Sequence, residues 1–383
     1  MRSDILILTN SIGGLYSFRK EVVKAIIDAG LEVHISVPDT DSEKADYFRK
    51  IGCHFLLTKF NRRGTSPIAD LKLFITYRRL MKSLKPMAVL TYTIKPNIYG
   101  GMAARISRVP QLSNITGLGD AMENGGWMKW LTVMLYRIGL KKAWRVFFQN
   151  ESNRVFCIRK GIARKDSILL PGSGVNLEFH SLQEYPKNEG RVRFLFIGRL
   201  LKDKGIDEFF EAAEHIFYRY PKTEFQVLGR IEGPYRGLID RLESCGVIKY
   251  LGVTTDVRPF IGAVECTVMP SYHEGMSNVN LESAANGRPV ITTNVPGCRE
   301  TVDNGVTGFL VEAKNTRSLE EAIEHFIQLP YNKKVLMGVE ARNKVEREFD
   351  RGIVVTAYLK ELDQIKRGSF GGASGGPTTG ATV

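Results

Sequence analysis

The stretch "CTVMPSYHEGMSNVNLESAANGRPVITT", residues 266–293, contains a complete strand–helix–strand unit. Its first six residues have the composition of a buried strand, and "PVITT" at 289–293 has that of a second strand. Between the two strands, Ser277 or Asn278 can cap a helix that runs to Gly287. Strands that are joined by a helix pair in parallel, so this stretch predicts a parallel sheet covered by helices.

The same alternation of strands and helices extends along the rest of the chain and starts again near residue 192. Such a series predicts two α/β domains, each a doubly wound, Rossmann-like parallel sheet, with a ligand cleft at the carboxyl ends of the strands. We expect strands at 4–9, 32–38, 87–93, 111–117, 145–150, 193–198, 224–229, 249–252, 266–271 and 289–293, and amphipathic helices at 17–29, 205–219 and 318–329.

Composition shifts suggest where the domains begin and end. We expect an N-terminal domain over residues 1–180, a polar linker over 181–191 and a C-terminal domain over 192–349. A C-terminal helix at 350–367 is expected to cross back to the N-terminal domain. The Gly/Ser/Thr-rich tail at 368–383 is expected to be disordered.

The length of 383 residues suits two domains, and the five scattered cysteines include no C-x-x-C pair. This usage argues against a disulfide framework and a zinc site, and it fits a reducing cytoplasm. The first residues, "MRSDILILTNSIGG", do not read as a signal peptide, and no apolar run is long enough to span a membrane.

Positive charge is concentrated in the first half of the chain. Residues 1–180 hold 28 lysines and arginines against 14 aspartates and glutamates, whereas the whole chain has a net charge of +13. An anionic partner is therefore expected for the first half: nucleic acid, a phospholipid surface or a phosphate-bearing substrate.

Two carboxylates flank the strand-to-helix turn of the opening stretch. Glu274 lies in the loop after the strand, and Glu282 lies about one turn into the helix. The N–H groups of Ser277, Asn278 and Val279 at the helix start suit a phosphate group. The plainer interpretation is an ordinary loop and a solvated helix, and this stretch alone does not exclude it.

Two further turns follow strands and carry groups that suit a phosphate. In "FLFIGRLLKDKG" (194–205), Arg199 offers a planar fork and Lys204 a point charge. In "TNSIGGLYSF" (9–18), Gly13 and Gly14 would let the backbone approach a ligand. The second motif lacks the full dinucleotide fingerprint, and each motif could by itself be a simple turn.

Taken together, these motifs resemble the retaining glycosyltransferase family four, which has the GT-B fold of two Rossmann-like domains. The resemblance rests on "GRLLKDKG" (198–205), on the E-x(7)-E block and on its continuation "GRPVITTNVPGCRETVDNGVTGFLV" (287–311). It extends through "GSGVN" (172–176). The first half, with "TIKPNIYGG" and "NITGLGDAM", is similar to bacterial transferases that build capsule, O-antigen or N-glycan units on undecaprenyl diphosphate.

The resemblance implies an enzyme, a hexosyl- or N-acetylhexosaminyltransferase, that moves a sugar from a UDP-sugar to a lipid-linked saccharide and forms an α linkage. It implies that Arg199 and Lys204 hold the leaving diphosphate, that Glu274 contacts the donor sugar and that Glu282 binds the ribose. The transferred sugar is expected to be an N-acetylhexosamine, such as N-acetylgalactosamine. The full set of implied donor-binding residues is Gly13, Gly14, Arg199, Lys204, Glu274, Gly275, Met276, Ser277, Asn278, Val279 and Glu282.

The sequence departs from this family pattern on the acceptor side. Many members carry a histidine in the loop after the fourth strand, but "TYTIKPN" (91–97) offers only Lys95 and Asn97. A same-face displacement lets the leaving phosphate accept the proton of the acceptor hydroxyl, so the missing base is compatible with the chemistry. No D-x-D pair is placed to carry Mg²⁺, and we expect neither a metal nor a cofactor.

The basic, aromatic segments 62–85 and 126–148 suit an anionic membrane surface, although they could also be ordinary core helices. We expect a peripheral protein on the cytoplasmic face of a bacterial inner membrane, with no nucleic-acid partner. Two alternatives stay open from the sequence: a GT-B-fold UDP-sugar epimerase, and a non-enzymatic basic protein that binds nucleic acid.

Overall fold

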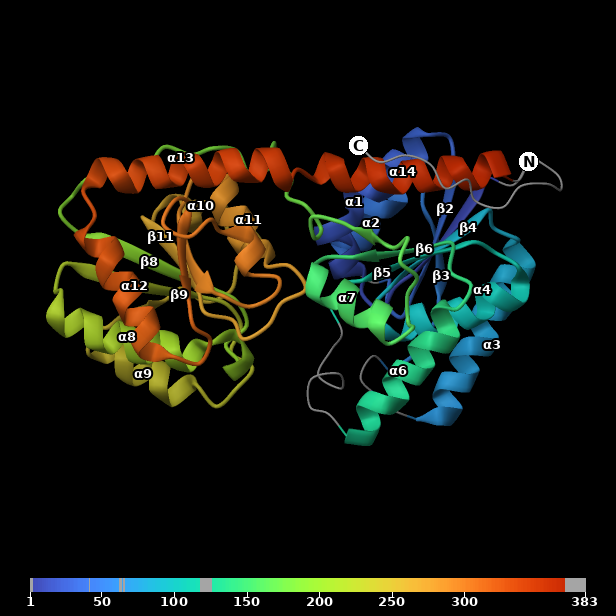
Figure 1. The fold of residues 1–383 in the computed structure, drawn as a ribbon, viewed down its shortest axis with the longest axis horizontal. Helices are drawn as coiled ribbons and strands as arrows, with labels where there is room; N and C mark the ends of the chain where they lie inside the picture. The colour runs from blue at the N-terminus through green and yellow to red at the C-terminus, as the bar shows by residue number, and fades with distance from the viewer. Residues whose placement is uncertain (1–2, 41, 62–63, 65, 118–125, 369–383) are drawn as a thin grey trace. The chain divides into compact units, whose positions relative to one another are not determined.

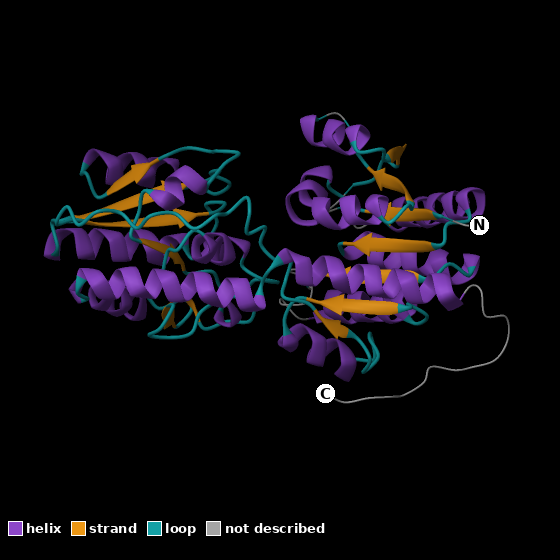
Figure 2. Cartoon of the chain, turned by 90° about the horizontal axis from the view of Figure 1, so that it is seen from above, coloured by secondary structure: helices purple, strands orange, loops and turns teal. Residues whose placement is uncertain are grey.

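The computed structural model describes residues 3–40, 42–61, 64, 66–117 and 126–368. The chain divides into two compact units. The first holds Met1–Phe148, Asn153–Leu169 and Val354–Val383, and the second holds Gln149–Ser152 and Leu170–Ile353. Each unit is a parallel sheet with helices on both faces (Figures 1 and 2), so the expected pair of doubly wound α/β domains is confirmed.

The first unit is built on a seven-stranded sheet with the order β3-β2-β1-β4-β5-β6-β7. Every neighbouring pair is parallel, and the order changes direction between β1 and β4, where doubly wound sheets bind ligands. The strands are β1 (Asp4–Leu8), β2 (Glu32–Val37), β3 (His54–Leu57), β4 (Ala88–Tyr92), β5 (Gln111–Ile115), β6 (Arg145–Phe148) and β7 (Ile168–Leu169).

Alternate residues of these strands face different helices, as the pleat requires. Leu6 and Leu8 of β1 face α3 and α4, whereas Phe147 of β6 packs on Tyr358 of α14 with ring centroids 4.6 Å apart. The helices of this unit are α1 (Ile12–Asp28), α2 (Glu43–Lys50), α3 (Pro67–Leu84), a π-helical turn (Pro96–Gly100), α4 (Gly101–Ser107), α6 (Gly126–Leu140), α7 (Glu151–Arg159) and α14 (Arg351–Gly368).

The second unit has a six-stranded sheet with the order β10-β9-β8-β11-β12-β13, again with parallel neighbours. β11 and β12 pair in parallel across α11, which is the arrangement expected of residues 266–293. The strands are β8 (Val192–Ile197), β9 (Thr223–Leu228), β10 (Ile248–Tyr250), β11 (Cys266–Met269), β12 (Val290–Thr293) and β13 (Gly308–Val311).

Aromatic side chains fill the core of the second unit. Phe194 of β8 and Phe225 of β9 stack with centroids 5.2 Å apart, and they bury Phe209 of α8 and Phe326 of α12 on the same face. The helices are α8 (Ile206–Arg219), α9 (Arg236–Ser244), α10 (Arg258–Gly262), α11 (Asn278–Ala285), α12 (Thr316–Gln328) and α13 (Tyr331–Glu348), with 3₁₀ turns at Lys202–Lys204 and Arg299–Thr301.

Sequence patterns missed three strands, β3, β7 and β13, and all three lie at sheet edges. Edge strands are short and partly exposed, so they lack the continuous apolar run that marks a central strand. In β3, for example, both end residues are exposed and the two between them are only partly buried.

The expected linker at 181–191 is not free, because it packs on the second unit. The Gln183 amide donates to Asn286 Oδ1 at 2.8 Å, the Tyr185 hydroxyl donates to the Glu265 carbonyl at 2.9 Å, and Arg288 donates to the Glu184 carbonyl at 2.7 Å. The second unit accordingly begins near residue 170 rather than 192, and the C-terminal helix rejoins the first unit at residue 354.

Two expectations concern the membrane and the tail. Within the described ranges, no helix combines the length and the apolar character needed to cross a bilayer. Residues 369–383, which make up nearly all of the tail expected to be disordered, lie outside the described residues.

Candidate functional site

The loop after β11 positions Glu274 beside a lysine from the loop after β8. Glu274 Oε1 accepts hydrogen bonds from Lys204 Nζ at 2.7 Å and from Ser271 Oγ at 3.0 Å. The side chains of Lys204 and Glu274 are only 14% and 19% exposed. The structure therefore brings together two of the three predicted catalytic residues, with restricted access to water.

Backbone contacts hold these two loops against each other. Gly205 has a φ of +70°, and a Cβ atom there would lie 2.1 Å from the Pro270 carbonyl oxygen. The Tyr272 N–H donates to the Asp203 carbonyl at 2.9 Å. Only glycine allows both this conformation and this close approach, so Gly205 fixes Lys204 beside the Glu274 loop.

Arg199, the third predicted catalytic residue, lies in a more open position. Its Nη1 is 3.1 Å from Glu232 Oε2, and its side chain is 46% exposed. The sequence analysis did not single out Glu232, which follows the neighbouring strand β9. Because the Arg199 fork has five N–H donors, most of them stay available for phosphate oxygens while Glu232 holds the side chain.

Helix α11 starts directly after the Glu274 loop. Ser277 is its N-cap, and the Ser277 hydroxyl accepts from the Asn280 N–H at 3.4 Å. The N–H groups of Asn278 and Val279 lie in the first turn, where a helix supplies no acceptor. One expectation is wrong: the Ser277 N–H is not free, because it donates to the Gly297 carbonyl at 2.7 Å.

Glu282 lies on α11 and is partly buried. Burial raises the pKa of its carboxyl group from 4.5 to about 7, and the nearby Arg351 opposes this shift. Arg351 acts through its charge alone, and no described residue forms a hydrogen bond to the carboxylate. A partly buried carboxylate without a hydrogen-bonded partner is suited to accept hydrogen bonds from hydroxyl groups of a ligand.

Several buried polar residues that the sequence analysis missed fix this part of the unit. Asn280 donates to Thr292 Oγ1 at 3.1 Å and to Thr301 Oγ1 at 3.0 Å, and Thr293 donates to the Ser271 carbonyl. Asn150 donates to the Gly275 carbonyl at 2.7 Å. The two threonines that end β12 could have been identified from the sequence, because polar residues in a buried strand need hydrogen-bond partners.

Gly275 and Met276 complete the predicted loop. A Cβ atom on Gly297 would lie 2.4 Å from the Glu274 carbonyl oxygen, so the segment at 297 lies directly against the loop backbone. The Met276 side chain is buried with Val175 and Leu281. Any ligand contact from Met276 would therefore come from its backbone.

The predicted residues of the first unit lie in two places. Gly13 and Gly14 form the first turn of α1, where the Gly14 N–H donates to Ser11 Oγ at 3.1 Å. A Cβ atom on either glycine would make only ordinary contacts of 3.6 Å or more. Neither local crowding nor backbone conformation demands glycine there, which is consistent with space kept for a ligand.

Lys95 and Asn97, the predicted acceptor-side residues, have partners inside the first unit. Lys95 Nζ is 2.6 Å from Asp70 Oδ1, and Tyr99 donates to the other oxygen of Asp70 at 2.8 Å. Asn97 is buried and donates to the Asn114 carbonyl at 2.9 Å. Both side chains thus have structural contacts, and their acceptor role stays a prediction.

No group of potential metal ligands in the described part of the chain contains Glu274 or Glu282. Asp4, Glu32 and His34 do form such a group, with ligand atoms within 4.8 Å of one another. They lie at or near the amino ends of β1 and β2, opposite the carboxyl ends where this architecture binds substrates. That the reaction needs no metal remains a prediction.

Both halves of the chain match families of known proteins. Residues 5–150 match "Glycosyl transferase 4-like" and residues 191–328 match "Glycosyl transferases group 1". Each match covers most of one of the two expected domains, and the second match includes Arg199, Lys204, Glu274 and Glu282.

Two relatives from bacteria align over most of this chain. It is 27% identical to N,N'-diacetylbacillosaminyl-diphospho-undecaprenol alpha-1,3-N-acetylgalactosaminyltransferase of Campylobacter jejuni, over 94% of this chain and 98% of that protein. It is also 27% identical to UDP-Gal:alpha-D-GlcNAc-diphosphoundecaprenol alpha-1,3-galactosyltransferase of Escherichia coli, over 79% of this chain and 80% of that protein.

Solved structures share the fold. The crystal structure of Anabaena HepE in complex with UDP aligns with a TM-score of 0.78 and 16% identity, over 95% of this chain and all of that chain. At this level of identity, the likeness shows the two-domain fold.

Proposed function

Because this chain is a glycosyltransferase with the GT-B fold, we propose that it transfers a sugar from a UDP-sugar to a saccharide linked to undecaprenyl diphosphate. The transfer retains the anomeric configuration and forms an α linkage. Both relatives described above are named for α-linked transfer to acceptors on diphosphoundecaprenol. We propose an N-acetylhexosamine, such as N-acetylgalactosamine, as the sugar.

The observation that carries this proposal is the Lys204–Glu274 pair, held beside the first turn of α11. The Lys204 ammonium has three donors, and Glu274 takes one of them. The two remaining Lys204 donors can stabilise a diphosphate as it leaves, together with the Arg199 guanidinium and the helix N–H groups. Glu274, fixed by Ser271 and Lys204, is placed to contact the sugar hydroxyls and to support positive charge at the anomeric carbon.

In the proposed reaction, the bond between the anomeric carbon and the β-phosphate oxygen of UDP breaks. A bond to the acceptor oxygen forms on the same face of the sugar, and the proton of the acceptor hydroxyl passes to the departing phosphate. Lys204 and Arg199 offset the negative charge that grows on the phosphate, so their effect is larger in the transition state than in the ground state.

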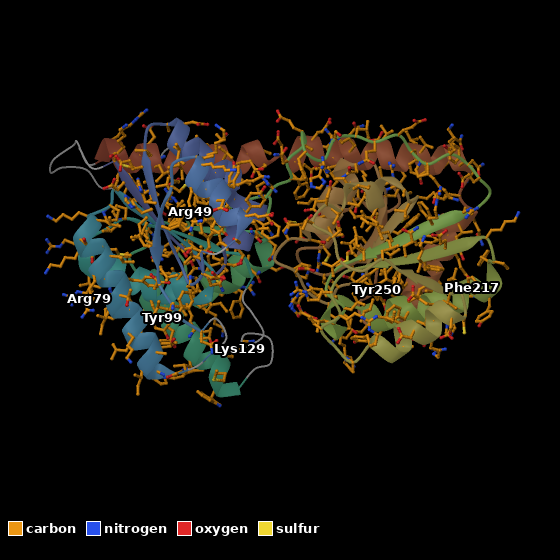
Figure 3. All side chains as sticks on the ribbon, turned by 180° about the vertical axis from the view of Figure 1, so that it is seen from behind. Arg49, Arg79, Tyr99, Lys129, Phe217 and Tyr250 are labelled. Atoms are coloured by element: carbon orange, nitrogen blue, oxygen red, sulfur yellow. The ribbon has the colours of Figure 1, made fainter. Side chains whose placement is uncertain are left out.

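Membrane association is a second part of the proposal. Trp127 of α6 is 71% exposed, and Ile68 and Leu71 of α3 are 70% and 57% exposed. Figure 3 shows the basic residues Lys129 and Arg79 on these same two helices. Exposed apolar side chains among cations suit the cytoplasmic, anionic face of a bacterial inner membrane.

The test of the reaction is an assay of purified protein with a panel of UDP-sugars and a short-chain polyprenyl diphosphate acceptor that carries one N-acetylhexosamine. We expect one UDP-N-acetylhexosamine to release UDP much faster with acceptor than without it. Mass spectrometry should show an acceptor larger by one sugar, and NMR should show an α linkage. No transfer from any UDP-sugar, or a β-linked product, would contradict the proposal.

The same assay separates the two alternatives. An epimerase would interconvert UDP-sugars with no acceptor present, and a nucleic-acid-binding protein would show salt-dependent binding to DNA and no transfer. No contact in the described residues favours either alternative, and the relatives are named transferases.

A further inference from the structure

Helix α6 carries a hollow along one of its faces. A cavity of 420 Å³ is lined by Gly126, Lys129, Trp130, Val133, Met134, Arg137 and Lys160. The six helical positions recur every three or four residues, so they form a single stripe along α6, and Lys160 follows the end of α7. We call this cavity the α6 groove.

One end of the α6 groove is cationic. A Cβ atom on Gly161 would lie 3.6 Å from the guanidinium nitrogens of Arg137, so Arg137 lies against the turn that carries Lys160. Both side chains are exposed. Among the residues that the structure describes, neither has a carboxylate within ion-pair distance. A guanidinium fork and an ammonium group at one point are suited to bind phosphate oxygens.

The body of the groove is apolar. Val133 and Met134 line it in partly buried positions, and Trp130 is 66% exposed. Lys129, near the start of the helix, lies 5.7 Å from the ring centre of Phe156. An exposed tryptophan leaves much apolar surface in water, and covering that surface with an apolar chain is favourable.

We propose that the α6 groove binds the lipid end of the acceptor, an isoprenoid diphosphate. Arg137 and Lys160 bind the diphosphate, and Trp130, Val133 and Met134 cover the first isoprene units. This inference rests on the proposed function and adds a binding site to it. The cationic end of the groove matches the charge of a diphosphate, and the hollow can enclose one apolar chain. Both features favour a single amphiphile with a diphosphate over a flat phospholipid surface.

The test uses farnesyl diphosphate as a soluble probe of the full-length protein. The chain has three tryptophans, so intrinsic fluorescence can report binding. We compare the double variant Arg137→Glu/Lys160→Glu with Arg159→Glu, a charge reversal at an exposed residue of α7 that does not line the groove. Trp130→Phe identifies the reporting tryptophan, and inorganic pyrophosphate and farnesol test each half of the probe separately.

We expect farnesyl diphosphate to bind more tightly than pyrophosphate or farnesol, and the double variant to weaken its binding about tenfold or more. Arg159→Glu should leave binding unchanged, and Trp130→Phe should remove most of the fluorescence change. In the transfer assay, the double variant should raise KM for the lipid acceptor and leave KM for the UDP-sugar unchanged.

Unchanged binding of farnesyl diphosphate by the double variant would overturn the inference, even if transfer to the lipid acceptor is observed. Binding of pyrophosphate as tight as that of farnesyl diphosphate would also overturn it, because the apolar body of the groove would then contribute nothing. If the protein transfers no sugar to any lipid acceptor, the proposed function fails, and the direct binding measurement still decides whether the groove holds an isoprenoid diphosphate.

Discussion

At the scale of single residues, the site depends on charges that are held in place before a ligand arrives. Glu274 is fixed by Lys204 and Ser271, and Arg199 is steadied by Glu232. Preorganised charge is effective because little reorganisation is needed when the transition state forms. Sequence patterns located Glu274, Lys204 and Arg199, but they could not locate Glu232, since it comes from a different strand end and has no motif of its own.

Replacing Lys204 should therefore reduce catalysis far more than stability. We expect Lys204→Ala and Glu274→Gln to lower kcat about 10²–10³-fold, the usual effect of removing one group that stabilises transition-state charge. Lys202→Ala is the matched control, because Lys202 is an exposed lysine on the same turn. Steady-state kinetics and circular dichroism measure the two effects, and full activity of either site variant would contradict the assigned roles.

The raised pKa of Glu282 should also be visible in the stability of the protein. Between pH 4.5 and about 7, the folded state holds a proton that the unfolded chain releases. The contribution of this group to the free energy of unfolding is therefore greatest below pH 4.5 and is lost as the pH rises to about 7.

Urea denaturation at several pH values measures this effect. Glu282→Gln should become more stable relative to the wild type as the pH rises through that window. Glu340→Gln on α13 controls for the loss of one carboxylate. A constant difference between wild type and Glu282→Gln from pH 4.5 to 7 would argue against the shifted pKa.

At the scale of helices and strands, the central strands were predictable, whereas β10 was the only predicted edge strand among the described residues. Buried strands such as β8 and β11 are recognised by their apolar runs, and helices such as α8 are recognised by their amphipathic spacing. The edge strands β3, β7 and β13 owe their form to pairing with a neighbour, which no local pattern encodes. The first turn of α1 was predicted as a glycine turn, but it is already helical.

That helical first turn allows stability and function to be separated. Gly13→Ala should stabilise the protein by up to about 1 kcal/mol, because alanine favours the helix and its Cβ atom fits without a clash. Because the Gly13 backbone is expected to lie close to the UDP-sugar, Gly13→Ala should also raise KM for the UDP-sugar roughly tenfold.

The control for this change is Gly237→Ala, at the second position of α9, where a Cβ atom has open space. It should stabilise the protein in a similar way without affecting kinetics. Thermal unfolding and initial rates give both quantities. A Gly13→Ala variant with wild-type KM would show that these glycines are not part of the donor site.

At the scale of the whole molecule, charge is distributed unevenly. The positive excess lies in residues 1–180, where the exposed side chains of α3 and α6 also lie. The sequence predicted this asymmetry well, because charge is additive and needs no structure. It could not show which cations are engaged: Arg145 pairs with Asp166 and with the buried Glu361, so it is poorly suited to contact a membrane.

The exposed lysines at the end of α6 make a cleaner test of membrane binding than Arg145. We expect Lys141→Glu/Lys142→Glu to bind vesicles with 30% phosphatidylglycerol about thirtyfold more weakly or worse, since each basic residue near an anionic surface contributes about 1 kcal/mol. Lys249→Glu/Lys333→Glu makes the same change of charge in the second unit. Vesicle co-sedimentation measures binding, and equal binding by both double variants would count against a membrane surface on the first unit.

The return of the last helix to the first unit has a consequence for how the protein is made. Tyr358 accepts from the Asn114 amide, and Glu361 accepts from Trp144 and Arg145, so residues near the end of the chain complete a core built mostly from its beginning. During synthesis, the ribosome releases these residues after the whole second unit. The first unit therefore stays incomplete until Tyr358 and Glu361 have left the ribosome, and the surfaces that they cover stay exposed during that interval.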